Sequence, residues 1–312
     1  MPISKEYAVE QLTAAHFLEL VPLMRDAFGT SAQPDYFRWK YLDNPAGPAI
    51  GTITRHRPSG AIAAFYGMIP EWCRYDGERR LIHQSCDTMT HSAHRRQGLF
   101  QALALETYAA AKAVDPAFAA FGFGGPTSTP GFLKMGWRIT AAVPYVFRPF
   151  PLTLLPQTQG HAEEVEILAA PDQRLLDRMA SEEKGAHVER SAEFLRWRLA
   201  NPLREYIILR DRDAYAVVTR AGDLLFVIDY RQEDGRAGRN VRAALRALSL
   251  RPRSKGLLSF CQPGSELHGQ LRSAGFLRNP LPRGPASGSI PLITYADVPS
   301  RWAVGPLDHD SY

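Results

Sequence analysis

Cysteine is scarce in this sequence of 312 residues, which has only three: Cys73, Cys86 and Cys261. They lie far apart and form no C-x-x-C pair, which excludes a disulfide framework and a cysteine zinc site. Isolated thiols are typical of a reducing compartment, so we expect a cytoplasmic protein. The nine histidines do not cluster either, apart from an H-x-x-H at His91 and His94, and we expect no metal cofactor.

Lysine is also rare, since only six of the 37 basic residues are lysine and the rest are arginine. The formal net charge is +5. No stripe of basic residues interleaved with aromatic residues appears, so we expect no nucleic-acid partner. The same positive field would suit an anionic small molecule.

Long apolar runs are missing. No stretch approaches the roughly 20 apolar residues that span a membrane, so we expect no membrane partner. The first 24 residues have neither a basic start nor a continuous apolar stretch, and we expect no signal peptide there. The sequence leaves the oligomeric state open.

The residues that are present predict an α/β fold. Alternating apolar residues predict strands at 7–13, 49–56, 61–70, 71–75, 81–90, 117–123 and 290–296. Helical spacing predicts helices at 14–28, 35–42, about 98–112 and 128–135. Residues 149–160 are rich in proline and glutamine and predict a linker. We expect the acidic tail after residue 300 to pack on the surface.

Two segments of the first half recur in the second. YFRWKYLDNP (36–45) is similar to FLRWRLANP (194–202), and AFGFGGPTSTPGFLKMGW (120–137) parallels LSFCQPGSELHGQLRSAGF (258–276). The paired tryptophans are 158 residues apart and the paired glycines 139, so the second copy lacks a piece equivalent to the 71–84 hairpin. We therefore predict a duplicated domain, with units at 1–148 and 164–312 joined by a linker at 149–163.

A basic loop precedes the helix that begins near residue 98. Arg95, Arg96, Gln97 and Gly98 follow the predicted strand 81–90. A helix N-terminus presents unpaired N–H groups, so an anion can bind there, and glycine lets it approach closely. The loop is neither a Walker motif nor a three-glycine dinucleotide fingerprint.

The hexapeptide RRQGLF (95–100) resembles the Q/R-x-x-G-x-G/A signature of the GNAT N-acyltransferase superfamily. The resemblance covers about residues 5–148 and implies two mixed-sheet domains with helices on both faces. It implies that the loop binds the pyrophosphate of acetyl-CoA and that segment 88–90 runs beside the pantetheine. We expect a small-molecule amine as the acceptor, and the sequence leaves a sugar amine, a small metabolite amine and a peptide amine all open. Phe100 stands where glycine or alanine is usual, so its side chain must turn away from the phosphates. The implied cofactor-binding residues are Thr88, Met89, Thr90, Arg95, Arg96, Gln97, Gly98, Leu99, Phe100 and Phe132.

The catalytic groups depart from the resemblance. Many members carry an asparagine and a tyrosine acid where this chain has Gly124–Gly125 and Phe132, so Ser128 or a water molecule must protonate the leaving thiolate. Asp87 and Glu71 are candidates for the general base. The alternatives are that Asp87 caps a turn and that Glu71 is a solvated edge residue. His83 is a third candidate, although a lone histidine on a strand is more often structural.

The second copy has Glu233 and Asp234 where the phosphate loop would lie, and these carboxylates would repel a pyrophosphate. We therefore expect one CoA per chain, bound by the first copy. The leading hypothesis is an acetyl-CoA-dependent N-acyltransferase. The alternatives are a non-catalytic CoA-binding or scaffold protein of the same fold, and an aminoacyl transferase resembling the peptidoglycan bridge-forming enzymes.

Overall fold

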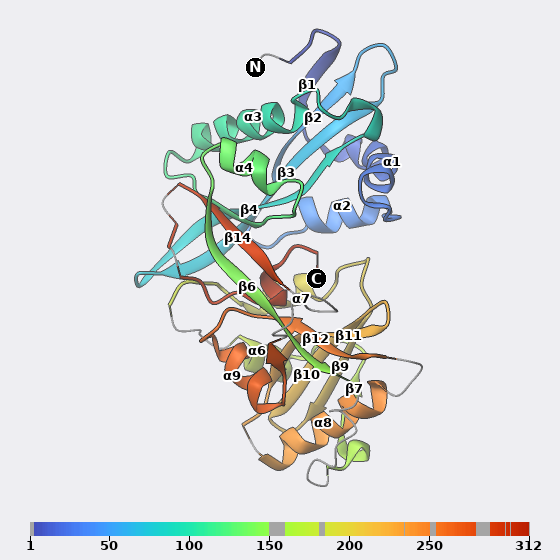
Figure 1. The fold of residues 1–312 in the computed structure, drawn as a ribbon, viewed down its shortest axis with the longest axis vertical. Coiled ribbons are helices and arrows are strands. Elements are labelled where there is room, and N and C mark those ends of the chain that lie inside the picture. Colours follow the sequence, from blue (N-terminus) through green and yellow to red (C-terminus); the bar gives the residue numbers. More distant parts are fainter. Residues whose placement is uncertain are drawn as a thin grey trace.

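The computed structural model describes residues 3–149, 160–180, 185–233, 235–249, 254–278, 288–296, 298–299 and 301–311. Among these residues, fourteen strands form one sheet that runs through two stacked halves (Figure 1). The predicted linker, 149–163, lies mostly outside the described residues, and the boundaries at 148 and 164 stay a prediction.

The first half follows the order of elements that the sequence predicts. The strands are β1 (Tyr7–Gln11), β2 (Ile50–His56), β3 (Ile62–Tyr75), β4 (Glu78–Thr90), β5 (Ala120–Phe123) and β6 (Arg138–Pro149). The helices are α1 (Phe17–Phe28), α2 (Pro34–Tyr41), α3 (Leu99–Val114) and α4 (Thr129–Lys134), with 3-10 turns η1 (Ala14–His16) and η2 (Ser92–His94). The prediction of separate strands at 61–70 and 71–75 is wrong, because pairing with β4 continues through Pro70 without a break.

The second half repeats this order. Its strands are β7 (Glu166–Leu168), β8 (His187–Val188), β9 (Tyr206–Asp211), β10 (Ala214–Ala221), β11 (Leu224–Arg231), β12 (Gly256–Phe260), β13 (Leu277–Arg278) and β14 (Ser289–Tyr295). Its helices are α6 (Gln173–Met179), α7 (Ala192–Arg198), α8 (Gly235–Ser249) and α9 (Glu266–Ser273), with 3-10 turns η3 (Ala162–Glu164) and η4 (Pro306–Asp308).

The two halves exchange their last strands. The strand order is β1-β2-β3-β4-β5-β14 in the first half and β7-β9-β10-β11-β12-β6 in the second, with β14 and β6 paired to each other. In each half the only parallel neighbours are the fourth and fifth strands of that order, β4 with β5 and β11 with β12, within the described residues. Figure 1 shows β6 running from the upper half into the lower one, beside β14. The halves are therefore covalently and topologically interlocked.

The segments that recur in the sequence lie at equivalent positions in the two halves. Trp39 lies in α2 and Trp197 in α7. Gly136 and Gly275 follow α4 and α9, and both have a positive φ, 88° and 85°, that favours glycine. The missing piece is also confirmed, because β3 and β4 have 14 and 13 residues whereas β10 and β11 have 8 each.

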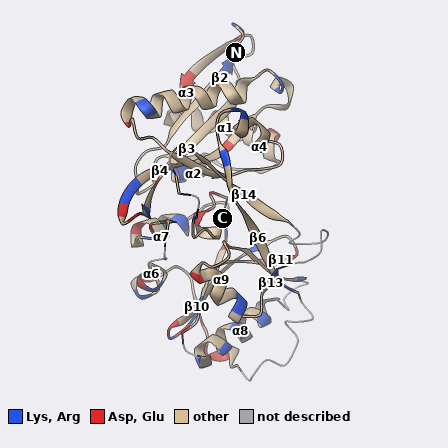
Figure 2. Ribbon diagram, turned by 60° about the vertical axis from the view of Figure 1, so that its left-hand side comes forward, with Lys and Arg blue, Asp and Glu red and all other residues tan. Residues whose placement is uncertain are grey.

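Helices cover both faces of the sheet, as predicted. Helices α3 and α4 pack on one face of the first half, and α8 and α9 on the corresponding face of the second. The opposite faces carry α1, α2, α6 and α7, whose apolar side chains join one core that spans both halves. Basic and acidic residues are interspersed along the described ribbon (Figure 2).

The prediction that the acidic tail packs on the surface is wrong. Val304, Leu307 and Asp308 are almost fully buried. The segment lies between the two halves, near the label C in Figure 1. Its apolar residues join the shared core, which outweighs the polarity of the segment.

Candidate acyl-transfer site

An opening between β4 and β5 forms the centre of the site. Within these described strands, pairing extends only from His83 to Ser85 on β4 and from Ala120 to Gly122 on β5. Beyond Ser85 the strands part, so the edge of β4 that leads to Thr90 is not bonded to β5. Asp87 lies at a β-bulge there, with a φ of 43°. The opening exposes main-chain groups of β4 to a ligand.

The predicted anion-binding loop lies at the start of α3. Gly98 is the residue before the helix and has a φ of 73°, and Arg96 has a φ of 63°. A Cβ on Gly98 would meet nothing within 4 Å, so the backbone conformation, and not lack of space inside the protein, requires glycine. Arg95, Arg96 and Gln97 are exposed. The first N–H groups of α3 have no partner within the helix and are available to an anion.

Asp26 of α1 holds this loop in place. Its carboxylate accepts hydrogen bonds from the main-chain N–H of Ser92 at 2.6 Å and from the Ser92 hydroxyl at 2.7 Å. These bonds keep the pKa of Asp26 below its usual value. The loop is thus fixed to the helix that also lines the cavity described below.

Phe100 turns away from the loop, as the sequence requires. Its ring lies 5.1 Å from that of Phe132, centroid to centroid, and packs on Gly131 of α4. A Cβ on Gly131 would lie 2.5 Å from the Phe100 ring, so a glycine in α4 makes room for it. The bulky residue of the hexapeptide is therefore accommodated by the core.

A cavity of about 430 Å³ adjoins the opening. Both halves contribute to it: α1, α2, β4, β5 and the start of α4 from the first half, and the segment after α7 from the second. The segment before the C-terminus forms a further wall. The lining residues include Met24, Phe28, Tyr36, Ser85, Cys86, Asp87, Thr88, Phe123, Ser128, Phe132, Asn201, Leu203, Arg204, Ile293, His309, Asp310 and Ser311.

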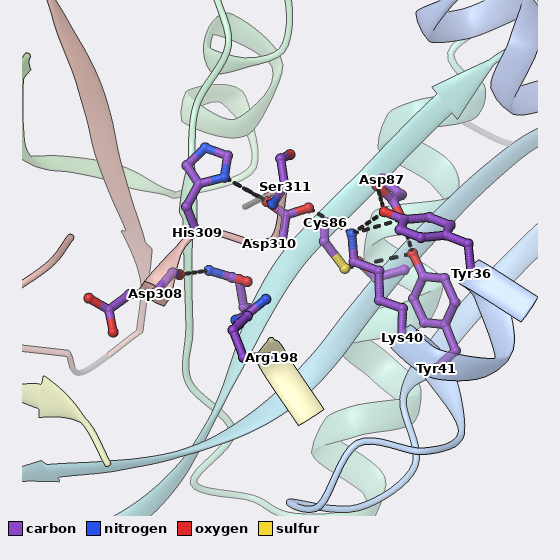
Figure 3. A network of polar contacts seen from close by, with 12 residues as sticks. Tyr36, Lys40, Tyr41, Cys86, Asp87, Arg198, Asp308, His309, Asp310 and Ser311 are labelled. Atoms are coloured by element: carbon purple, nitrogen blue, oxygen red, sulfur yellow. Dashed lines mark hydrogen bonds and ion pairs between the residues drawn. The ribbon is translucent and has the colours of Figure 1, made fainter. Parts of the chain in front are cut away.

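Asp87 is the centre of a polar network in this cavity (Figure 3). Tyr41 donates a hydrogen bond to Asp87 Oδ2 at 2.8 Å, and Lys40 Nζ lies 2.9 Å from the same oxygen. Tyr36 donates to Oδ2 at 3.2 Å and to Oδ1 at 3.4 Å. Among the described residues, Oδ1 thus receives only this long contact. It is the oxygen that can accept a hydrogen bond from a ligand.

Lys40 joins Asp87 to Asp310. The Lys40 ammonium is fully buried and lies 2.8 Å from Asp310 Oδ2. Burial alone would lower the pKa of Lys40, but Asp310 and Asp87 outweigh burial and hold the pKa well above its usual value. Burial alone would raise the pKa of Asp310, but the ammonium of Lys40 is the main opposing charge, and the pKa stays below its usual value. Lys40 is therefore charged, and Asp310 is a carboxylate.

The phenols and the imidazole of the cavity are neutral near pH 7. Burial and the nearby Asp87 raise the pKa values of Tyr36 and Tyr41. Burial lowers the pKa of His309 to about 4. The His309 ring stacks on Phe123 with centroids 4.5 Å apart, and its Nδ1 accepts a hydrogen bond from the Ser311 N–H at 3.1 Å. The same nitrogen lies 3.4 Å from Asp310 Oδ1.

Ser128 and Phe132 line the cavity from the start of α4. The Ser128 hydroxyl oxygen accepts a hydrogen bond from the Gly125 N–H at 3.2 Å. Phe132 is buried and packs on Trp137 with centroids 4.8 Å apart. Position 132 thus holds an apolar ring, and Thr127 and Ser128 are the hydroxyl-bearing residues of this segment that line the cavity.

The other two candidate bases lie outside the cavity. Glu71 is not a solvated edge residue but is almost fully buried, with Oε1 2.8 Å from Arg198 of the second half. Burial raises the pKa of Glu71 to about 8. His83 packs on Phe118 with centroids 5.4 Å apart, and burial lowers its pKa to about 4. The structure therefore brings Asp87 and Ser128 together and separates them from Glu71 and His83.

Residues that sequence reasoning missed complete the site. Lys40 and Tyr41 belong to the helix that the sequence predicts at 35–42, and Asp310 belongs to the acidic tail. A lysine among aromatic residues at helical spacing was a usable signal, because a buried lysine needs a carboxylate partner. No local pattern marked the partner 270 residues away.

The corresponding region of the second half is filled. Beside Asp229 on β11 and Glu266 on α9 there is a space of only about 10 Å³. Helix α8 begins at Gly235, so Gly238 lies inside the helix, where a Cβ would clash with Gln232. Glu233 forms ion pairs with Arg178 and Arg231, and Asp234 lies outside the described residues. These observations favour a single CoA site in the first half.

Within the described residues, no three histidine, cysteine or acidic side chains are arranged to hold a metal ion. No described helix has both the length and the apolar character needed to cross a membrane.

Comparison with known proteins agrees with the geometry. Residues 8–140 match the family model described as an acetyltransferase (GNAT) domain. The matched residues are thus a GNAT domain. No curated protein sequence matches the chain. Acyl transfer from an acyl-CoA is the general activity of a GNAT acetyltransferase domain, and the acceptor is a separate question.

Three solved structures share the fold of the whole chain, and their low identities make this a likeness of fold alone. A probable N-acyltransferase from Enterococcus faecalis has a TM-score of 0.63 at 13% identity, covering 92% of this chain and 71% of its own. A tandem GNAT protein from the clavulanic acid biosynthesis pathway has a TM-score of 0.62 at 12% identity, covering 93% and 98%. N-myristoyltransferase from Saccharomyces cerevisiae, solved with myristoyl-CoA, has a TM-score of 0.60 at 11% identity, covering 95% and 80%. The chain thus has a tandem GNAT fold.

Proposed function

We propose that the protein is an N-acyltransferase that moves an acetyl group from acetyl-CoA to a primary amine of a small acceptor. One observation supports this above all: the loop at the start of α3 and the cavity around Asp87 lie at the two ends of the opening between β4 and β5. A donor with an anionic head and a narrow arm matches such an arrangement. We also propose a cytoplasmic location, because all three cysteines are free and buried.

Different residues would bind different parts of the donor. Arg95, Arg96, Gln97 and the N–H groups of Gly98, Leu99 and Phe100 would hold the pyrophosphate. The unpaired edge of β4 at Thr88, Met89 and Thr90 would accompany the pantetheine, and Phe132 would lie against the far end of the arm. When bound, acetyl-CoA supplies an acyl group on a thioester, whose carbon–sulfur bond breaks as the new amide bond forms.

Asp87 and Ser128 would assist the two proton transfers, from the acceptor amine and to the departing sulfur. Because Oδ1 of Asp87 has only one long contact, it can accept a proton from the acceptor amine, directly or through water. Ser128 would place a water molecule near the departing sulfur, since a hydroxyl is a poor acid at neutral pH.

The test is thiol release from acetyl-CoA with a panel of primary amines, together with calorimetric titration of CoA. We expect one CoA site per chain and amine-dependent release of thiol. CoA binding without turnover would leave the non-catalytic scaffold, and activity only with aminoacyl-tRNA would leave the aminoacyl transferase. Two equivalent CoA sites would contradict the assignment of the second copy.

A further inference from the structure

The segment 305–311 is anchored firmly enough to carry a binding group. Asp308 is fully buried, and its carboxylate accepts a hydrogen bond from the Gly305 N–H at 2.7 Å. Gln84 Nε2 on β4 donates to the Asp308 main-chain oxygen at 2.5 Å. Arg190 of the second half lies 3.4 Å from Asp308 Oδ2. Contacts from both halves therefore fix the position of Asp310, two residues further on.

The cavity wall formed by Asp87, Lys40 and Asp310 has more negative than positive charge. Lys40 reaches one oxygen of each carboxyl group, at 2.9 and 2.8 Å, and it does so from a position with no exposed surface. Two carboxyl groups share this one ammonium, so the wall as a unit is anionic. The two carboxyl side chains are 7% and 11% exposed, which leaves them accessible to a ligand in the cavity.

The other charged or titratable groups that line the cavity are Tyr36, His309, Cys86 and Arg204. His309 is neutral near pH 7, since burial lowers its pKa to about 4. The Cys86 thiol is neutral because burial raises its pKa. Arg204 also lines the cavity, and it donates two hydrogen bonds to the main-chain oxygen of Ser311, the residue after Asp310.

We propose that Asp310 and Asp87 together form the subsite for the acceptor's ammonium group, so that the substrate is a small amine that binds in its protonated form. The assignment deepens the proposed function and rests on it for the reaction, although binding can be measured without turnover. Asp310 is then a specificity-determining residue contributed by the end of the second half to the cavity of the first.

The experiment measures binding of benzylamine, butylamine and tyramine by calorimetry at pH 7.5, with benzyl alcohol as the uncharged match of benzylamine. We expect wild type to bind at least one of the amines and to ignore benzyl alcohol. Asp310→Asn should weaken amine binding about 10- to 100-fold, because it removes a charged hydrogen-bond partner. Asp310→Glu should restore most of the affinity. Asp223→Asn, which removes an exposed carboxylate paired with Lys255, is the matched control and should change nothing.

Melting temperature and CoA titration show whether each variant is folded. If Asp310→Asn fails to fold, Asp310→Glu and the comparison of benzylamine with benzyl alcohol still decide the matter. Equal binding of benzylamine and benzyl alcohol, or no amine binding by wild type, overturns the subsite. So does amine-dependent thiol release with the same KM in wild type and folded Asp310→Asn, which leaves the proposed function standing. Asp310-dependent amine binding without thiol release from any amine supports the subsite and overturns the acyl transfer.

Discussion

Trp39 and Trp197 each donate the indole N–H to the main-chain oxygen of the other, at 2.6 and 2.7 Å. Their rings stack with centroids 5.1 Å apart and planes 20° from parallel. The pair is reciprocal, as expected for equivalent residues across a pseudo-twofold axis. The turns that follow agree, because Asn44 accepts a hydrogen bond from the Ala46 N–H and Asn201 from the Leu203 N–H. The two tryptophans that recur in the sequence thus contact each other across the two copies.

We predict that Trp39→Phe and Trp197→Phe each destabilise the protein by about 1–3 kcal/mol, because each removes a buried hydrogen bond and disturbs the stacked ring pair. Symmetry predicts similar losses of stability in the two variants. Because the two residues are in contact, the loss in the double variant should differ from the sum of the two single losses. Urea unfolding of the three variants measures this. Trp302→Phe, which removes a bond to Pro299 outside the pair, should be additive with either. Additivity of Trp39→Phe with Trp197→Phe would contradict the coupling.

We predict that Gly98→Val weakens CoA binding by at least about tenfold, since valine is strained at a φ of 73° and the loop must move to relieve about 1–2 kcal/mol. Gly60 provides the control. It has a φ of 71° and equally open surroundings but lies in the turn between β2 and β3. Gly60→Val should cost similar stability and leave CoA affinity unchanged in calorimetric titration. Equal effects of the two variants on CoA affinity would argue against the loop as the phosphate site.

For the leaving thiolate, we predict that Ser128→Ala lowers the rate of thiol release by roughly tenfold or less, below the range of full general-acid catalysis. Phe132→Tyr should leave the rate unchanged or raise it, because it supplies a phenolic group at the position of the family's acid. Steady-state thiol release is the measurement, after CoA affinity has been shown to be unchanged. An unaltered rate in Ser128→Ala would remove Ser128 from the mechanism.

The raised pKa of Glu71 predicts that the stability of the protein depends on pH. This pKa is raised to about 8 by burial, against an ordinary value of 4.5, although Arg198 opposes the shift. Between these values the folded state binds a proton that the unfolded state does not, so the free energy of unfolding falls as pH rises through about 4.5 to 8. The contribution of Glu71 to this slope is at most about 1.4 kcal/mol per pH unit.

Glu71→Gln should remove this contribution. We expect the free energy of unfolding of the variant to be close to that of wild type near pH 5. It should exceed the wild-type value by a growing margin up to pH 8.5, as measured by urea unfolding at intervals of half a pH unit. Glu189→Gln, which breaks a more exposed pair with Arg79, is the control and should show no such gain. A stability difference that stays constant across this range would mean that the buried pair is ionised throughout.

The strand exchange predicts that neither half folds alone. Without its partner, residues 1–149 would leave β5 without β14, and residues 160–312 would leave β12 without β6. Unpaired strand edges promote aggregation. We expect each fragment to be insoluble when expressed separately and the two to copurify when coexpressed. A soluble, CoA-binding fragment 1–149 would show that the exchange is dispensable.

Local patterns carried most of the prediction of the first half. The strands of alternating residues, the helix after Gly98 and the glycine that follows α4 depend on neighbours within a few positions, and periodicity captures such preferences. The repeat was also visible, because Trp39 and Trp197 keep similar flanking residues. Asp87 and Ser128 were found because they lie beside the elements that the GNAT resemblance marked.

By itself, the sequence determined the order of the elements, the basic loop at Arg95–Gly98 and the duplication. Only the tertiary structure decided that β6 and β14 change places, because a strand carries no local signal for which half will pair with it. It also decided that the acidic tail is buried and that Asp310 meets Lys40 and Asp87. Burial of a charged side chain is costly unless a group of opposite charge lies beside it. For Asp310 that group is Lys40, which lies on a helix 270 residues earlier.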